Sequence, residues 1–338
     1  MADQSSVPTG AASDTTTSAS ILDFRLSLDD LQVTGHDLVR PECVLALRDG
    51  TLLTSDGRGG VTRIAPDGTQ TRLGEVGGEP NGLALAPDGS IYIANIALGV
   101  VQRLFPDGHV ETFLGELNGT PLTCANFVFL DSKQRLWCAF STREAIWWPA
   151  AAHPRPDGFI VLVDERGLRI VADGIYFTNE IRLDADERYL YVAETMKARM
   201  LRFPVNADGS LGEREVFGPD GLGMGAYVDG FAFDAEGNVW VTTVTRNGLV
   251  IITADGSDAH VVFEDASDDL LRSFQQRIAE GMAEPRDMAA AMGKRLRFPT
   301  SVAFGGPDLR TVYLGSLAMP HLPTFRSPVP GLPLSHWR

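Results

Sequence analysis

Six short apolar segments of this chain are each preceded, within two residues, by a polar side chain that carries oxygen. These side chains are Glu42, Asn81, Asn126, Asn179, Asp229 and Ser301. If the fold gathers them, the two carboxylates repel each other and the amides lose their hydration. A hard divalent cation removes both penalties, because Ca²⁺ takes about six to eight oxygen ligands from carboxylates, amides and water. The residue types therefore indicate a metal site, on the condition that the fold brings them together.

A second interpretation of these residues needs no metal. Asn and Asp often begin strands and turns, and the Asn-Gly and Asp-Gly pairs at 81–82 and 229–230 fit a turn. Glu42 follows a proline, and no turn residue follows Asn126 or Asn179, so this interpretation explains those three residues less well. Both interpretations stay open from the residues alone. A zinc site is disfavoured, because the six histidines form no cluster with metal-ligand spacing.

The elements that would position these residues form a repeat. An alternating strand, a tight turn and a second alternating strand recur six times, at residues 44–56, 83–95, 127–140, 181–194, 231–243 and 302–316. The turns carry Asp-Gly, Pro-Asp-Gly or Glu-Gly-Asn, which accept the backbone angles of a hairpin. Further alternating runs lie between the hairpins, so each unit holds about four strands in about 40 to 50 residues, the size of a propeller blade.

The repeat predicts an all-β fold, a six-bladed β-propeller with four-stranded blades, formed by residues 21–338 as a single domain. Too little chain follows the sixth hairpin for a full blade, so we expect a strand within about residues 24–38 to complete that blade and close the ring. The first strand of each propeller blade lies innermost. The six polar residues are therefore expected to converge near the axis.

One segment, at about residues 264–297 between the fifth and sixth hairpins, departs from the repeat and predicts a helical insertion. Five apolar residues fall on one face at helical spacing, namely Leu270, Leu271, Phe274, Ile278 and Met282. We favour a helix that packs on the side of the propeller and covers a sheet edge. A lid or a subunit contact is the alternative.

Composition limits the partners. The net charge of −15 repels phosphate backbones and anionic headgroups, so we expect neither nucleic acid nor a membrane as a partner. Three scattered cysteines make no disulfide framework, which favours a reducing, cytoplasmic location for a soluble protein. Residues 1–20 are small and polar and lack the features of a secretory signal, so we expect a disordered tail there. The sequence leaves the oligomeric state open.

The hairpin starts resemble those of the regucalcin/gluconolactonase family of six-bladed propellers. The resemblance covers about residues 38–318 and is most specific in PECVLALRDGTLLTSD, EPNGLALAPDGSIYIAN, TNEIRLDADERYLYVAET, VDGFAFDAEGNVWV and TSVAFGGPDLRTVYLGS. It implies that Glu42, Asn126, Asn179 and Asp229 hold one divalent cation. Ca²⁺ is the expected ion, with Zn²⁺, Mn²⁺ or Mg²⁺ as alternatives.

The resemblance further implies hydrolysis of a small-molecule lactone or a related ester. In this chemistry a metal polarises the carbonyl while water attacks. Asp229 is the expected catalytic residue that takes the proton from that water. Asn81, Asn126, Cys124 and Tyr227 are expected to contact the substrate.

One departure from the family pattern concerns the substrate. Sugar lactonases of the regucalcin type carry a basic residue where this chain has Cys124, so an apolar or aromatic lactone becomes a hypothesis. Tyr227 and Trp147 would suit such a substrate, although aromatic residues also pack between blades.

Two other functions fit the same ring. A propeller of the strictosidine-synthase kind is a lyase that uses no metal, and a non-catalytic calcium-binding propeller would use the metal for structure alone. Hydrolysis that depends on a metal separates the predicted enzyme from both.

Overall fold

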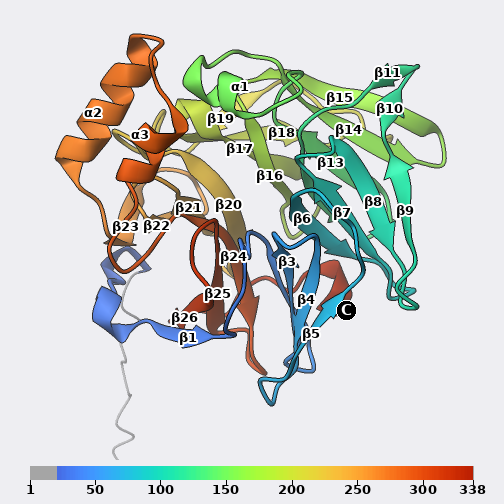
Figure 1. Ribbon diagram of the computed structural model, residues 1–338, viewed down its shortest axis with the longest axis horizontal. Helices are drawn as coiled ribbons and strands as arrows, with labels where there is room; N and C mark the ends of the chain where they lie inside the picture. The colour runs from blue at the N-terminus through green and yellow to red at the C-terminus, as the bar shows by residue number, and fades with distance from the viewer. Residues whose placement is uncertain (1–20, 338) are drawn as a thin grey trace, which may run out of the picture.

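Six four-stranded antiparallel sheets surround a central axis in the computed structural model, which describes residues 21–337 (Figure 1). The prediction of an all-β, six-bladed propeller with four-stranded blades is confirmed. The tail predicted for residues 1–20 lies outside the described residues.

Each of the first five blades consists of four strands that follow one another in the chain. Blade 1 contains β2 (Val44–Ala46), β3 (Leu52–Asp56), β4 (Gly60–Ile64) and β5 (Gln70–Leu73). Blade 2 contains β6 (Pro80–Leu85), β7 (Ile91–Asn95), β8 (Val100–Leu104) and β9 (Val110–Leu114). Blade 3 contains β12 (Ala125–Leu130), β13 (Leu136–Phe140), β14 (Gly158–Asp164) and β15 (Gly167–Ile175). Blade 4 contains β16 (Thr178–Leu183), β17 (Tyr189–Glu194), β18 (Arg199–Pro204) and β19 (Glu215–Phe217). Blade 5 contains β20 (Val228–Phe233), β21 (Val239–Thr243), β22 (Gly248–Ile252) and β23 (Ala259–Glu264).

The sixth blade joins the two ends of the propeller chain. Its strands are β24 (Pro299–Gly305), β25 (Thr311–Ser316), β26 (Leu322–Arg326) and β1 (Gln32–Thr34). β1 pairs antiparallel with β26, with Gln32 opposite Thr324, so the predicted closure by an N-terminal strand is confirmed. Closure of this kind ties the first and last parts of the ring together through main-chain hydrogen bonds.

The remaining elements lie between the blades. They are the hairpin β10 (Glu116–Leu117) and β11 (Thr120–Pro121), the helices α1 (Trp148–Ala152), α2 (Asp268–Ala279) and α3 (Pro285–Ala290), and single 3-10 turns at Ile21–Asp23, Leu28–Asp30, Thr195–Lys197 and Ser335–Trp337. The predicted insertion is therefore helical, as α2 and α3. Among residues 21–337, no helix combines the length and the apolar character that a membrane span requires.

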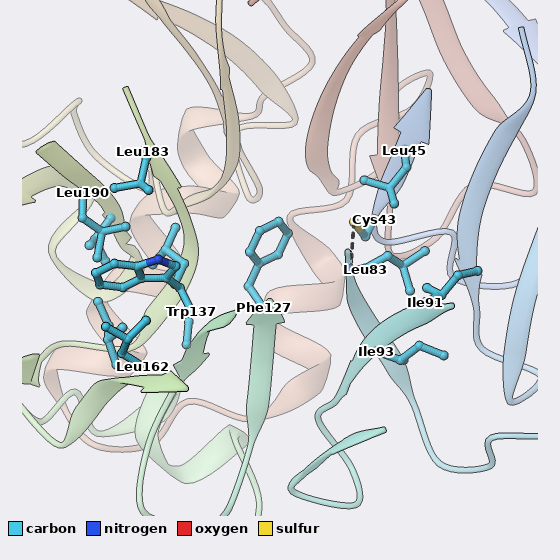
Figure 2. Packing of buried hydrophobic residues seen from close by; sticks show 14 of the residues in the cluster. Cys43, Leu45, Leu83, Ile91, Ile93, Phe127, Trp137, Leu162, Leu183 and Leu190 are labelled. Atoms are coloured by element: carbon cyan, nitrogen blue, oxygen red, sulfur yellow. Dashed lines mark hydrogen bonds between the residues drawn. The ribbon is translucent and has the colours of Figure 1, made fainter. Parts of the chain in front are cut away.

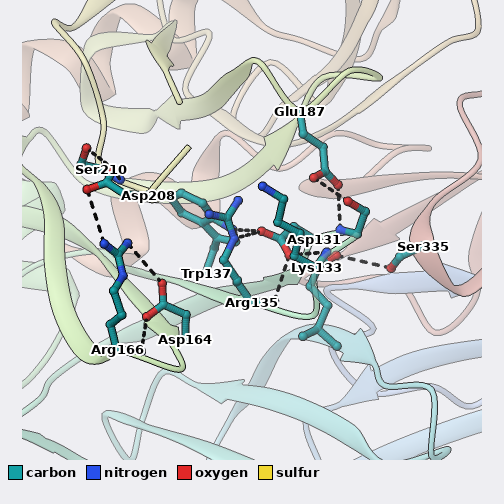
Figure 3. A network of polar contacts seen from close by, with 12 residues as sticks. Asp131, Lys133, Arg135, Trp137, Asp164, Arg166, Glu187, Asp208, Ser210 and Ser335 are labelled. Atoms are coloured by element: carbon teal, nitrogen blue, oxygen red, sulfur yellow. Dashed lines mark hydrogen bonds and ion pairs between the residues drawn. The ribbon is translucent and has the colours of Figure 1, made fainter. Parts of the chain in front are cut away.

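Two of the hairpin turns show why the repeated sequence folds as it does. Asp131 accepts hydrogen bonds from the backbone nitrogen of Arg135 at 2.9 Å and from the indole nitrogen of Trp137 at 3.0 Å (Figure 3). In blade 5, Asp234 accepts from the indole nitrogen of Trp240 at the same 3.0 Å. An aspartate at the turn and a tryptophan six residues later thus fix the hairpin and bury the indole between blades.

Apolar side chains of the inner strands fill the space between blades. Figure 2 shows Leu83 and Cys43 from neighbouring blades, where the backbone nitrogen of Leu83 lies 3.4 Å from the Cys43 sulfur, and Phe127 from the next blade. All three cysteines are buried and unpaired. Burial of these close-packed faces holds each blade to the next.

The segment that follows β26 closes one end of the central channel. It contacts the ends of the inner strands: the backbone nitrogen of Leu332 donates to Phe233 at 2.9 Å, the Ser335 hydroxyl to Leu130 at 3.3 Å (Figure 3), and the Trp337 indole to Ala46 at 2.6 Å. His336 also reaches Ala46 and is partly buried, and burial lowers its pKa to about 4. This C-terminal plug carries no periodic sequence signal and was not predicted.

Replacing Trp337 by Ala is expected to lower the free energy of unfolding by about 3 kcal/mol, as for other large buried aromatic residues. The side chain is 8% exposed, and its hydrogen bond to Ala46 joins the last residues of the chain to blade 1. Urea denaturation measures the change. Trp337→Phe serves as the control, since it keeps most of the packing and loses about 1 kcal/mol with the hydrogen bond. Equal midpoints for the wild type and Trp337→Ala would contradict a stabilising plug.

Candidate active site

A cavity at the other end of the channel is lined by the starts of the inner strands. It contains about 660 Å³ of space not filled by protein atoms, part of it open to solvent. Glu42, Asn81, Asn126, Asn179 and Asp229 all line it. The structure thus brings five of the six polar residues to one place, although they are far apart in the chain.

Four of the inner strands present these side chains where the strand begins with an irregular register. The pairing of β6, β12, β16 and β20 with the next strand shifts between Pro80 and Leu83, Ala125 and Phe127, Thr178 and Ile181, and Val228 and Phe231. Asn81, Asn126, Asn179 and Asp229 each lie inside such a shift. A bulge turns a side chain away from the pleat, and here it supplies a polar residue to the cavity.

The pairs at 81–82 and 229–230 lie inside strands β6 and β20, so they are not turns. Their glycines allow close approach of the neighbouring blade: a Cβ on Gly82 would lie 2.6 Å from the Cα of Phe127. The turn interpretation of these two pairs is therefore wrong. Glycine is required there because inner strands converge near the axis.

Ser301 and Cys124 do not line the cavity. The hydroxyl of Ser301 accepts a hydrogen bond from the backbone nitrogen of Val44 at 3.2 Å. The buried thiol of Cys124 faces the carbonyl oxygen of Glu144 at 3.3 Å, and burial raises its pKa to about 12. It is neutral and is not positioned to contact a substrate in this cavity, contrary to the prediction from its place in the sequence.

Arg40 is a cavity residue that the sequence analysis missed. It adopts a left-handed conformation with φ of 48°, and its guanidinium donates to the side-chain oxygen of Asn81 at 2.7 Å and to the carbonyl of Pro80 at 3.2 Å. Asn81 in turn donates to a Glu42 carboxylate oxygen and to the carbonyl of Asn126, each at 2.9 Å. Asn81 is thus fully hydrogen-bonded within the protein. The only sequence signal for this role was the position of Arg40, a basic residue two places before Glu42.

Two oxygens in the cavity residues lack a partner. Asn126 Oδ1 and Asp229 Oδ1 are buried and make no hydrogen bond in the structure. Glu42, Asn126, Asn179 and Asp229 are each at most 8% exposed. Unpaired buried acceptors are costly, so such oxygens fit the ligand set of a hard cation. Among residues 21–337, no group of three or more His, Cys, Asp or Glu side chains could hold a metal ion. The candidate ligand set in this cavity is of another kind, since it consists of two carboxylates and two amides.

The charges of the cavity favour a cation. Burial raises the pKa of Glu42 to about 7, against the opposing effects of Arg40 and Asn81. Burial, together with the negative charges of Glu42 and Glu180, raises the pKa of Asp229 well above its usual range. When no metal is bound, the positive charge near these two carboxyls is therefore too small to offset the cost of ionising them in a buried site.

Glu180 lies behind the cavity in a buried ion pair. Its carboxylate pairs with Arg182, whose Nε also donates to the carbonyl of Phe231 at 2.6 Å. Burial still raises the pKa of Glu180 to about 8. Because Glu180 has its own partner, Glu42 and Asp229 are the carboxylates left to bind a metal in the cavity.

The helical insertion forms part of the cavity wall. Phe274 of α2 and Met288 of α3 line the cavity together with Tyr227, whose ring packs edge-on against Phe274 at 6.1 Å between centroids. The insertion therefore contributes to the cavity wall, and we call α2 and α3 the lid. That these helices also cover a sheet edge stays a prediction. The predicted apolar face was too wide, because Leu270 is 42% and Met282 51% exposed.

Comparison with known proteins gives concordant results. The sequence profile of the SMP-30/gluconolactonase/LRE-like region matches residues 41–264. The 6-deoxy-6-sulfogluconolactonase of Pseudomonas putida is 26% identical over 212 residues, which cover 62% of this chain and 60% of that relative. The chain thus spans about three fifths of the relative's length.

Two solved structures share the fold over most of both chains. A gluconolactonase from Xanthomonas campestris has a TM-score of 0.64 at 20% identity, covering 90% of this chain and 91% of its own. A calcium-binding regucalcin from Agrobacterium tumefaciens has a TM-score of 0.63 at 18% identity, covering 90% and 98%. At these identities the likeness concerns the fold.

Proposed function

Because this chain belongs to the SMP-30/gluconolactonase/LRE-like family, we propose that it is a divalent-metal-dependent hydrolase that opens a lactone or a related carboxylic ester. The observation that carries the proposal is the pair of unpartnered buried oxygens, on Asn126 and Asp229, in a cavity that also contains Glu42 and Asn179. These four side chains are the proposed metal ligands. Calcium is the first candidate, since the ligands are all oxygens and a related propeller binds it.

The chemistry that a divalent cation supplies in such a site is polarisation of the ester carbonyl and neutralisation of the developing oxyanion. Asp229 acts as the proton acceptor. Its buried Oδ1 has no hydrogen-bond partner within the protein, so this carboxylate can take a proton from the water that attacks the carbonyl carbon. The ring C–O bond then breaks, and the proton passes to the leaving alkoxide, which gives a hydroxy acid.

Arg40 positions the polar end of the substrate, and Asn81 holds Arg40 in place. Hydrogen bonds to Asn81 and Pro80 fix the guanidinium on the cavity wall, so its charge is available to the carboxylate of the product. Asn126 and Asn179 orient the ester group from the adjacent strands. The lid at the mouth and the C-terminal plug at the far end limit access of bulk water to the reacting group.

Hydrolysis of a panel of γ-, δ- and aryl-lactones, followed with a pH indicator before and after treatment with a chelator, tests the proposal. We expect turnover of at least one lactone, its loss on chelation and its recovery with Ca²⁺ or another divalent cation. Turnover that survives complete removal of divalent cations would favour a metal-independent enzyme. Metal binding with no turnover of any ester would favour a calcium-binding propeller.

A further inference from the structure

The wall of the cavity above the proposed ligands is apolar. It is lined by Trp147 from the loop before α1, Phe177 from the loop before β16, Tyr227 from the loop before β20, and Phe274 and Met288 from the lid. The rings pack in two pairs: Trp147 lies edge-on to Phe177 at 6.4 Å, and Tyr227 lies edge-on to Phe274 at 6.1 Å between centroids. Because most of this surface is carbon, its contact with a hydrocarbon group is more favourable than its contact with a hydroxyl group.

Three side chains of this wall already use their hydroxyl groups within the protein, namely Thr195, Thr245 and Tyr227. The hydroxyl of Thr195 donates to Val228 at 2.7 Å and accepts from Asn179 at 3.2 Å. The hydroxyl of Thr245 donates to Gly225 at 2.6 Å. Tyr227 hydrogen-bonds with Gln275 of α2, which turns its polar end to the lid. A polyhydroxylated substrate would therefore leave buried hydroxyls unpaired, at a large cost in binding.

The lid is held in place over this wall. Arg277 of α2 forms an ion pair with Asp287 of α3 at 2.6 Å, which links the two helices. The α2–α3 turn approaches the end of α1, since a Cβ on Gly281 would lie 3.2 Å from the His153 ring. Figure 1 shows α2 and α3 at one side of the ring, near α1. Two insertions from different blades thus build one apolar enclosure.

We infer that the substrate is a lactone whose ring carries an alkyl or aryl group, and that this group lies between the lid and the aromatic wall while the ester faces Arg40 and the proposed ligands. The inference rests on the proposed function and deepens it. It disfavours a sugar lactone as the preferred substrate, because the wall between the lid and the aromatic residues is mostly apolar and the polar groups lie at the ester end of the cavity.

A homologous series tests the inference. The calcium-loaded full-length protein is assayed with δ-valerolactone, δ-octanolactone, δ-decanolactone and glucono-δ-lactone. We expect kcat/KM to rise about fourfold per added methylene, and δ-decanolactone to exceed glucono-δ-lactone by about 100-fold or more. Calorimetric titration with δ-lactams that carry the same alkyl groups, which are not hydrolysed, measures the same trend as binding affinity.

Two lid variants test whether the lid produces the gain per methylene. Phe274→Ala and Met288→Ala are expected to reduce the gain per methylene to about twofold in both assays, because each removes part of the apolar enclosure. Met288 is only partly buried, so its variant serves if Phe274→Ala does not fold. Met282→Ala is the matched control, since Met282 is 51% exposed and does not line the cavity. Its gain per methylene should match the wild type.

The outcomes separate the inference from the proposed function. Chelator-sensitive hydrolysis that prefers glucono-δ-lactone, with no gain along the alkyl series, overturns the inference alone. Absence of chelator-sensitive hydrolysis overturns the proposed function. In that case the lactams still decide the inference: an affinity that rises with chain length and falls in the lid variants supports an apolar ligand, and a flat series overturns it.

Discussion

Asp229→Asn is expected to lower kcat/KM about 10³-fold or more on every lactone that the protein hydrolyses. The substitution keeps the shape of the side chain, but it removes the charge that a cation needs and the basic oxygen that accepts the proton from water. Steady-state kinetics measures the loss. Elemental analysis after dialysis against a trace of calcium measures the accompanying fall in metal content.

The same substitution should leave the metal-free protein at least as stable as the wild type. Burial and the negative charges of Glu42 and Glu180 oppose ionisation of Asp229, so a neutral amide relieves repulsion that the native residue imposes. Thermal unfolding in the presence of chelator should therefore give an equal or higher midpoint. Loss of activity together with retained stability identifies a residue kept for function and not for packing.

A surface residue provides the control for Asp229→Asn. Asp107 lies in an exposed turn and accepts a hydrogen bond from the backbone nitrogen of His109 at 2.9 Å, a role that Asn also fills. Asp107→Asn should change neither kinetics nor metal content. If Asp229→Asn retained activity and the wild-type protein contained no divalent ion, a metal-independent reaction of the strictosidine-synthase kind would explain the cavity better.

The blades could be predicted because their signals are local. Alternation of apolar residues and the Asp-Gly turns specify each hairpin within about 14 residues, and the six-fold repeat then leaves few arrangements besides a ring. The C-terminal plug could not be predicted in the same way. Leu332 and Trp337 are placed by contacts with blades 5 and 1, which are distant in sequence.

The polar residues of the cavity could be predicted because they share one position in the repeat. What could not be predicted is how the backbone directs neighbouring side chains. Arg40 and Cys124 both lie two residues before a proposed ligand and both have positive φ, yet Arg40 lines the cavity and Cys124 faces Glu144. The lid residues Phe274 and Met288 needed tertiary placement, because a helical pattern specifies an apolar face but not the surface that it covers.

Gly230→Ala is expected to lower the free energy of unfolding by more than about 3 kcal/mol, at or beyond the upper end for overpacked sites. Gly230 follows Asp229 in the innermost strand of blade 5, where blade 6 approaches most closely. A Cβ there would overlap the carbonyl oxygen of Thr300 and the carboxylate of Glu180, and would lie 2.8 Å from the Cα of Ser301. Backbone atoms cannot rotate aside, so blades 5 and 6 must separate near the cavity.

Urea denaturation of Gly230→Ala and of a matched variant, Gly115→Ala, measures the effect. Gly115 also lacks a positive φ, and its added Cβ would meet only side-chain carbons of Thr112 and Val100, at 3.3 and 3.4 Å. Both substitutions reduce the entropy of the unfolded chain equally, so the difference between them reports the close approach of the blades. Gly115→Ala should change the unfolding free energy by less than about 1 kcal/mol. Equal stabilities for the two variants would mean that the inner strands can accommodate an added Cβ. The ligand-bearing bulges would then not be held by contact between neighbouring blades.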